Sequence, residues 1–114
     1  MLDLVSLPEH LRTRTRVLVD AAPLSGCVVY WMRVAARDHE NPALDVALTA
    51  ANALGTTALV YHAVSERYPY ASDRHHTFIL EGARDVARGL DQRGIAYALH
   101  VERPGARGPM LRWL

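Results

Sequence analysis

Three short apolar runs alternate with two helical patterns between residues 27 and 101, and this alternation restricts the chain to few folds. The runs cover residues 27–32, 58–61 and 97–101, and the first shows no polar alternation. A continuous apolar run of this length is typical of a strand buried on both faces of a parallel sheet. The sequence therefore predicts an α/β fold, a partial doubly wound (Rossmann-like) sheet of about three strands.

The two helical patterns carry start signals, stop signals and an apolar stripe at three- and four-residue spacing. The signals are Asn41, Pro42 and Gly55 for the first helix, and Ser72 or Asp73 and Gly94 for the second, which we expect to reach about Arg93. The stripes are Leu44, Ala47, Leu48, Ala51 and Leu54 in the first helix, and Ile79, Ala83, Val86, Ala87 and Leu90 in the second.

Crossovers between parallel strands are right-handed, so a strand order of 3-2-1 places both helices on one face of the sheet. Only the N-terminal segment is then available to cover the opposite face. We expect Val28, Val29, Tyr61 and Leu99 to face water there. Each such side chain forgoes roughly 1.5–3 kcal/mol of burial, which predicts a sticky, marginal or partnered chain.

The chain divides at about residue 26. Residues 1–26 predict an N-terminal helix over residues 8–19, with Pro8 in its first turn, and a loop over residues 21–26. Residues 27–114 form the α/β domain. Residues 109–114 resemble the start of a further helix, so we expect a truncated domain; the alternative is a terminal tail that docks Trp113 onto the sheet.

Composition excludes several classes of protein. The net charge is +1, and all 13 basic residues are arginine, which suits phosphate binding; the alternative is a GC-rich genome that favours arginine codons. The single cysteine, Cys27, excludes an internal disulfide and fits a core residue in a reducing, cytoplasmic setting. We find no secretory signal and no apolar stretch of the ~20 residues that cross a bilayer.

Phosphate-loop, dinucleotide-binding and hydrolase-elbow glycine motifs are all absent. His75 and His76 are adjacent on a helix, so their rings point apart and do not suit one metal ion. The remaining candidates for ligand binding follow the strands, where α/β folds place ligands. They are Arg33, His62, Glu102 and Arg103, with Arg67, Tyr68, Tyr70, Arg74 and His75 on the long loop and the helix start. The alternative is that these loops are polar only because they meet water.

Two segments resemble the N-terminal domain of DNA photolyases, and are most similar to the class II cyclobutane pyrimidine dimer branch. One is residues 28–33, with Tyr30, Trp31 and Met32; the other is residues 70–82, with Phe78, Leu80 and Gly82 at alternate positions. The turn at residues 102–105 also fits.

The resemblance implies a two-domain light-driven repair enzyme. Its α/β domain lodges an antenna chromophore, a deazaflavin or a folate, and its helical domain binds FAD and the flipped dimer. Every residue that contacts FAD or the dimer belongs to the helical domain, so no catalytic residue and no bound cofactor are expected in this chain. The antenna site corresponds to Trp31, Met32, Arg33 and His62.

The leading hypothesis is an antenna-type N-terminal domain of a photolyase-like DNA repair protein, inactive alone, that meets DNA only through a helical FAD-binding domain encoded separately or lost. The alternative is a stand-alone nucleotide- or chromophore-binding module, completed by a partner chain or by dimerisation through the uncovered sheet.

Overall fold

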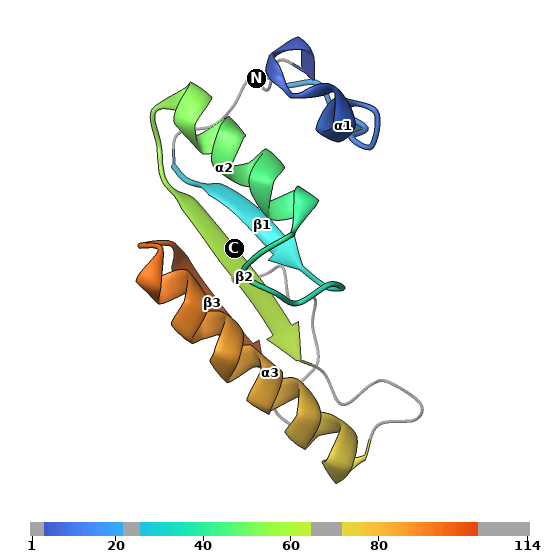
Figure 1. Ribbon diagram of the computed structural model, residues 1–114, viewed down its shortest axis with the longest axis vertical. Helices are drawn as coiled ribbons and strands as arrows, with labels where there is room; N and C mark the ends of the chain where they lie inside the picture. The colour runs from blue at the N-terminus through green and yellow to red at the C-terminus, as the bar shows by residue number, and fades with distance from the viewer. Residues whose placement is uncertain (1–3, 22–25, 65–71, 103–114) are drawn as a thin grey trace.

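The computed structural model describes residues 4–21, 26–64 and 72–102 (Figure 1). The elements in chain order are the 3-10 helix Leu4–Ser6, α1 Glu9–Arg12, β1 Val28–Met32, α2 Pro42–Leu54, β2 Ala58–Val64, α3 Asp73–Gln92 and β3 Ala96–Val101. The predicted strand–helix alternation is confirmed.

The three strands form one parallel sheet in the order β1-β2-β3, which is the predicted order 3-2-1 from the other edge. Tyr30 of β1 lies beside Val60 of β2, and Val60 beside Tyr97 of β3. β2 is therefore central, while β1 and β3 are edge strands within the described part of the chain.

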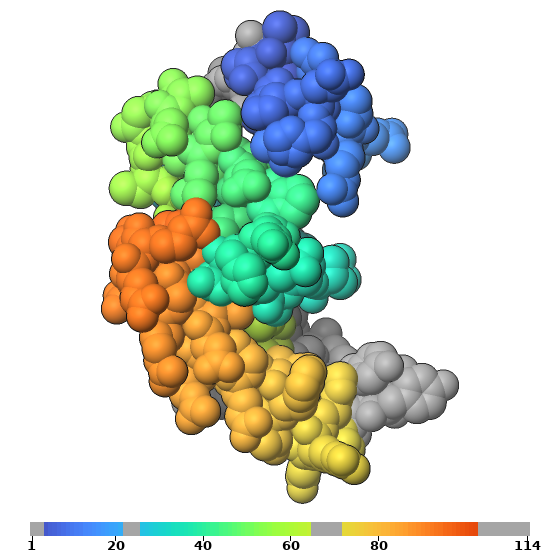
Figure 2. Space-filling view, in the orientation of Figure 1, coloured from blue at the N-terminus to red at the C-terminus, as the bar shows by residue number. Residues whose placement is uncertain are grey.

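Both long helices cover the same face of the sheet, as predicted (Figure 1). Their stripes meet the strands in one core, formed by Met32, Leu44, Val60, Val86 and Leu90. In the space-filling view, α2, the segment after β1 and α3 form a continuous surface on this side (Figure 2). We call it the helix side, and the opposite face the open side.

The predicted helix over residues 8–19 is wrong in extent, because α1 ends at Arg12. The hydroxyls of Thr13 and Thr15 donate to the carbonyls of Glu9 and Leu11, 3.1 and 2.7 Å away. β-Branched residues also lose side-chain freedom in a helix. The alternation of arginine with threonine after α1 therefore has a larger effect on the local structure than the seven-residue spacing of Leu11 and Leu18.

The prediction for the open side is wrong for three of its four residues. Side chains alternate along a strand, so Val28 and Leu99 lie on the helix side with Met32 and Tyr97. Tyr61 lies on the open side but is only 3% exposed, while Val29 is 39% exposed there as expected.

Residues 4–21, the described part of the N-terminal segment, do not cover the open side either. Leu11 and Arg14 lie beside Pro42 and Val46 at the start of α2, so the segment packs on a helix instead of on the sheet. Cys27 is exposed, contrary to its predicted core role, because the first strand begins one residue later. The predictions for residues 109–114 and Trp113 fall outside the described residues.

Two glycines allow a matched stability test. A Cβ at Gly82 inside α3, or at Gly55 after α2, would meet nothing within 4 Å, but Gly55 has a φ of 65°. We expect Gly82→Ala to raise the free energy of unfolding by about 0.5–1 kcal/mol through helix propensity. Gly55→Ala should lower it by about 1 kcal/mol, because alanine disfavours a left-handed backbone. Urea unfolding of both variants checks the opposite signs, and equal shifts would contradict the prediction.

Candidate functional site

The carboxyl ends of the three parallel strands lie along one edge of the sheet, at Met32, Val64 and Val101. α/β folds bind ligands at such an edge. His62 was predicted to follow the second strand, but β2 continues to Val64 and His62 lies inside it. The register explains the difference, because residues 62–64 pair with residues 99–101 of β3.

His62 is buried on the helix side, with a hydrogen-bonding partner on the next strand. It is 5% exposed, and its Nδ1 lies 2.8 Å from the hydroxyl of Tyr97. Burial lowers the pKa of His62 below its ordinary value of 6.5 and raises the pKa of Tyr97 to about 12. Both groups are therefore neutral at neutral pH.

The buried imidazole predicts a loss of stability in mild acid. The unfolded chain takes up a proton at His62 near pH 6.5, whereas the folded chain does so only at lower pH. The free energy of unfolding should therefore fall as the pH drops below about 6.5, until the folded pKa is reached. Urea unfolding between pH 5 and pH 8 checks this, with His62→Gln as the comparison. The variant should show a shallower pH dependence, and an unchanged slope would contradict the assignment.

The open side carries one cation–π contact, at the end of β1, and one pair of rings between β2 and β3. The guanidinium carbon of Arg33 lies 5.1 Å from the ring centroid of Trp31, within the range of a cation–π interaction. The hydroxyl of Tyr61 lies 3.1 Å from Nδ1 of His100, and the two rings meet edge to face. Trp31 is 37% exposed, so the contact between Arg33 and Trp31 lies at the surface.

Asn41 organises the segment after β1, residues 33–41. Its side chain is almost fully buried, and Nδ2 donates to the carbonyls of Ala35 and Arg37, 3.3 and 3.1 Å away. Its Oδ1 also caps α2 by accepting from the amide of Leu44. The carbonyl of Asp38 accepts from the Arg93 guanidinium, which joins the segment to the end of α3. Sequence reasoning found the cap but missed the loop contacts.

The four residues predicted to hold an antenna chromophore do not converge. Met32 is fully buried in the core and His62 faces the helix side, whereas Trp31 and Arg33 lie on the open side. The sheet separates the two pairs, and Arg33 occupies one face of the Trp31 ring. These side chains do not form one cradle for a planar chromophore in this structure.

The other predicted loop residues divide between described and undescribed parts. Arg74 is exposed and His75 half-buried at the start of α3, where the amide of His75 donates to Ser72 Oγ. The amide of Glu102 donates to the carbonyl of Val64, which extends the ladder beyond β3. Arg67, Tyr68, Tyr70 and Arg103 lie outside the described residues.

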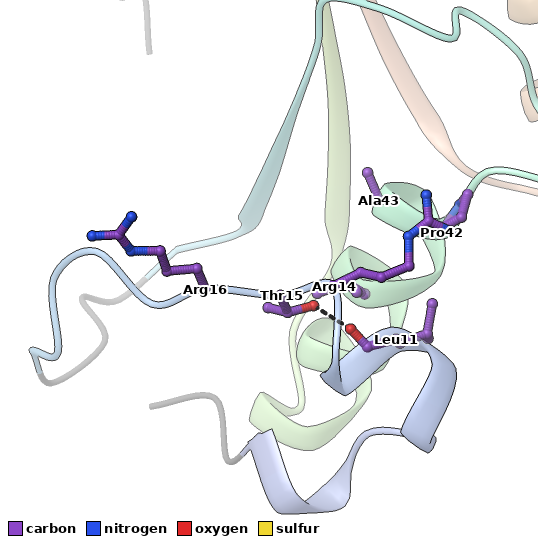
Figure 3. Close-up of a pocket in the computed structure, with 7 residues that line it drawn as sticks. Leu11, Arg14, Thr15, Arg16, Pro42 and Ala43 are labelled. Carbon is purple, nitrogen blue, oxygen red and sulfur yellow. Dashed lines mark hydrogen bonds between the residues drawn. The ribbon is translucent and has the colours of Figure 1, made fainter.

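A hollow of about 380 Å³ lies between the N-terminal segment and the start of α2 (Figure 3). Its lining residues are Leu11, Arg14, Thr15, Arg16, Pro42, Ala43 and Val46. Arg14 extends toward Pro42, whereas Arg16 points away from the helix (Figure 3). The hollow contains none of the predicted antenna residues.

Two further searches cover only residues 4–21, 26–64 and 72–102. No three His, Cys, Asp or Glu side chains there gather closely enough to hold a metal ion. No helix in those ranges has the length and apolar character needed to span a bilayer.

The DNA photolyase family model matches residues 28–110, which include all three strands and both crossover helices. The chain belongs to the DNA photolyase family. It is also 40% identical over 86 residues to the deoxyribodipyrimidine photo-lyase of Methanothermobacter thermautotrophicus. That alignment covers 75% of this chain and 19% of the relative's length.

The family match confirms the resemblance read from the sequence, and the three-stranded parallel sheet agrees with the α/β domain it implies. The chain spans about a fifth of the photolyase it matches. The two photolyase-like segments fall in different settings: residues 28–33 form β1 and its end, whereas Phe78 lies 77% exposed on α3.

Proposed function

We propose that this chain serves as the N-terminal, antenna-type α/β unit of a photolyase-like DNA repair protein and does not repair DNA by itself. The family match over residues 28–110 carries the proposal. The 40% identity to a deoxyribodipyrimidine photo-lyase supports dimer-containing DNA as the substrate of the assembled protein. In the assembled protein, DNA and FAD are then bound by a helical domain that lies outside residues 28–110.

The arrangement of the strand edge supports a unit that is inactive alone. Light-driven repair needs a reduced flavin close to a dimer held in a snug pocket. Among the described residues, Met32 and His62 are buried on the helix side of the sheet, and Arg33 partly covers the Trp31 ring. A flavin or an antenna pigment that uses these residues requires a further wall from another part of the assembled protein.

A domain exchange tests the proposed role. Residues 28–110 replace the matching segment of the Methanothermobacter photolyase, and the chimera is assayed for light-dependent loss of dimers from an oligonucleotide. We expect repair at a measurable fraction of the parent rate. A soluble chimera that binds FAD but leaves the dimers intact would contradict the proposal.

The inactivity of the isolated chain has its own test. The purified chain is illuminated with FAD, a reductant and dimer-containing DNA, beside a protein-free sample and a complete photolyase. We expect no loss of dimers above the protein-free sample. Loss that scales with protein concentration would overturn this part, and a deazaflavin or folate band in the purified chain would favour the stand-alone chromophore module.

A further inference from the structure

The hollow beside the start of α2 combines an apolar surface with a single charge that reaches over it. Its volume of about 380 Å³ lies within the range of small-molecule sites. Four of its lining residues are apolar: Leu11, Pro42, Ala43 and Val46. Leu11 is 4% exposed, and Pro42 and Val46 are half-buried. A small apolar body placed there would therefore cover side chains that are already largely shielded from water.

Hydrogen bonds on the N-terminal side fix the shape of the hollow. The amide of Arg14 and the hydroxyl of Thr15 both donate to the carbonyl of Leu11, 3.1 and 2.7 Å away. These bonds turn the chain after α1, and residues 14–16 then pass the first turn of α2 without filling the space beside it (Figure 3). The hollow exists before any ligand binds, which lowers the cost of ordering on binding.

Arg14 supplies the charge at this surface. Its side chain extends toward Pro42, whereas that of Arg16 points away from the helix (Figure 3). The acidic residues of the two flanking helices, Glu9 and Asp45, do not line the hollow. Within residues 4–21, 26–64 and 72–102 the Arg14 guanidinium forms no ion pair. Its planar fork of N–H donors is therefore available to a carboxylate or a phosphate, which it matches in shape.

We propose that this hollow binds a small organic anion. The carboxylate or phosphate of the ligand lies on the Arg14 guanidinium, and its apolar body lies against Pro42 and Val46. Leu44, on the opposite face of α2, packs in the core, so the site is on the face of α2 that is turned away from the sheet. It is separate from the strand edge and from the proposed repair function.

The first test is a titration of the full ¹⁵N-labelled chain with benzoate, followed by NMR. We expect saturable shifts at the amides of Leu11, Ala43 and Val46, with a dissociation constant of about 1 mM or lower. Phenyl phosphate in a parallel titration shows which anionic group binds more tightly. Shifts that do not saturate with either anion, or that spread over exposed arginines across the surface, would overturn the proposal.

Two neutral or smaller probes separate the contributions of charge and apolar surface. Benzyl alcohol keeps the ring but lacks the charge, and acetate keeps the charge but lacks the ring. Each should bind at least about tenfold more weakly than benzoate, because each makes only one of the two contacts. Acetate binding as tightly as benzoate would show that Arg14 attracts any anion and that the hollow contributes nothing, which would also overturn the proposal.

A pair of methionine variants forms the matched control. Arg14→Met keeps an apolar stem beside Pro42 but removes the charge, and should raise the dissociation constant for benzoate about tenfold or more. Arg16→Met removes a charge that points away, and should change the constant less than about twofold. Both arginines are exposed, so both variants should unfold in urea close to the parent. Equal effects of the two variants on benzoate binding would overturn the assignment of Arg14.

Discussion

Replacing Asn41 by alanine should lower the free energy of unfolding by about 3 kcal/mol. The side chain is 3% exposed, and Oδ1 caps α2 through the amide of Leu44. The two hydrogens of Nδ2 are shared among three acceptors, the carbonyls of Ala35 and Arg37 and the Tyr30 hydroxyl, with the hydroxyl 3.1 Å away. Losing a cap costs about 1 kcal/mol, and each polar group left without a partner inside the protein costs about 1–3 kcal/mol more. Urea unfolding measures the loss.

Asn52 provides the matched control on the same helix. Its side chain is exposed, so Asn52→Ala should change the free energy of unfolding by less than about 0.5 kcal/mol. Asn41→Asp keeps an oxygen to cap α2 but places a second, buried carboxyl oxygen against the carbonyl oxygens of Ala35 and Arg37, so its loss should be at least as large as that of Asn41→Ala. Equal losses for the two alanine variants would show that Asn41 does not hold the segment after β1.

Asn41 also illustrates what the sequence reveals about this fold and what it conceals. A cap depends on residues within one turn, so Asn41, Pro42 and Gly55 predicted the bounds of α2. The contacts to residues 33–41 depend on a loop in which Ala35 and Glu40 have φ of 52° and 47°. Neither residue type favours that conformation, so no local signal predicts it.

The candidate site was harder to predict because strand length and side-chain direction are set across the sheet. β2 extends to Val64 because its last residues pair with β3, and this places His62 inside the sheet. A shift of one residue moves a side chain to the other face. The photolyase resemblance placed Trp31 and Met32 in one antenna site, whereas the pleat of β1 puts their side chains on opposite faces of the sheet.

The N-terminal helix was predicted too long for a related reason. Leu11 and Leu18 stand seven residues apart, which fits a helix, but the residues between them alternate with period two. In the structure α1 ends at Arg12, as the alternating pattern favours, but the alternating residues after it form no strand. A strand needs a neighbour to complete its hydrogen bonds, and none of the described residues supplies one to residues 16–20.

Met32→Ala should lower the free energy of unfolding by about 3 kcal/mol. The side chain is 0% exposed and lies in the core with Leu44, Val60, Val86 and Leu90. Truncation removes buried apolar surface and leaves a cavity where both crossover helices meet the sheet. Urea unfolding measures the effect, and the slope of the transition should stay unchanged if the folded structure persists.

Met32→Leu separates packing from ligand binding at the same position. Leucine nearly conserves the volume, so this variant should lose less than about 1.5 kcal/mol. Met32 is also one of the residues that the photolyase resemblance assigns to an antenna site, and a side chain with no exposed surface serves that site only by supporting the strand. The leucine variant should therefore behave like the parent in the domain-exchange repair assay, after stability is matched. A selective loss of repair with leucine would show that the thioether itself contacts a bound group, and Met32 would then have to leave the core in the assembled protein.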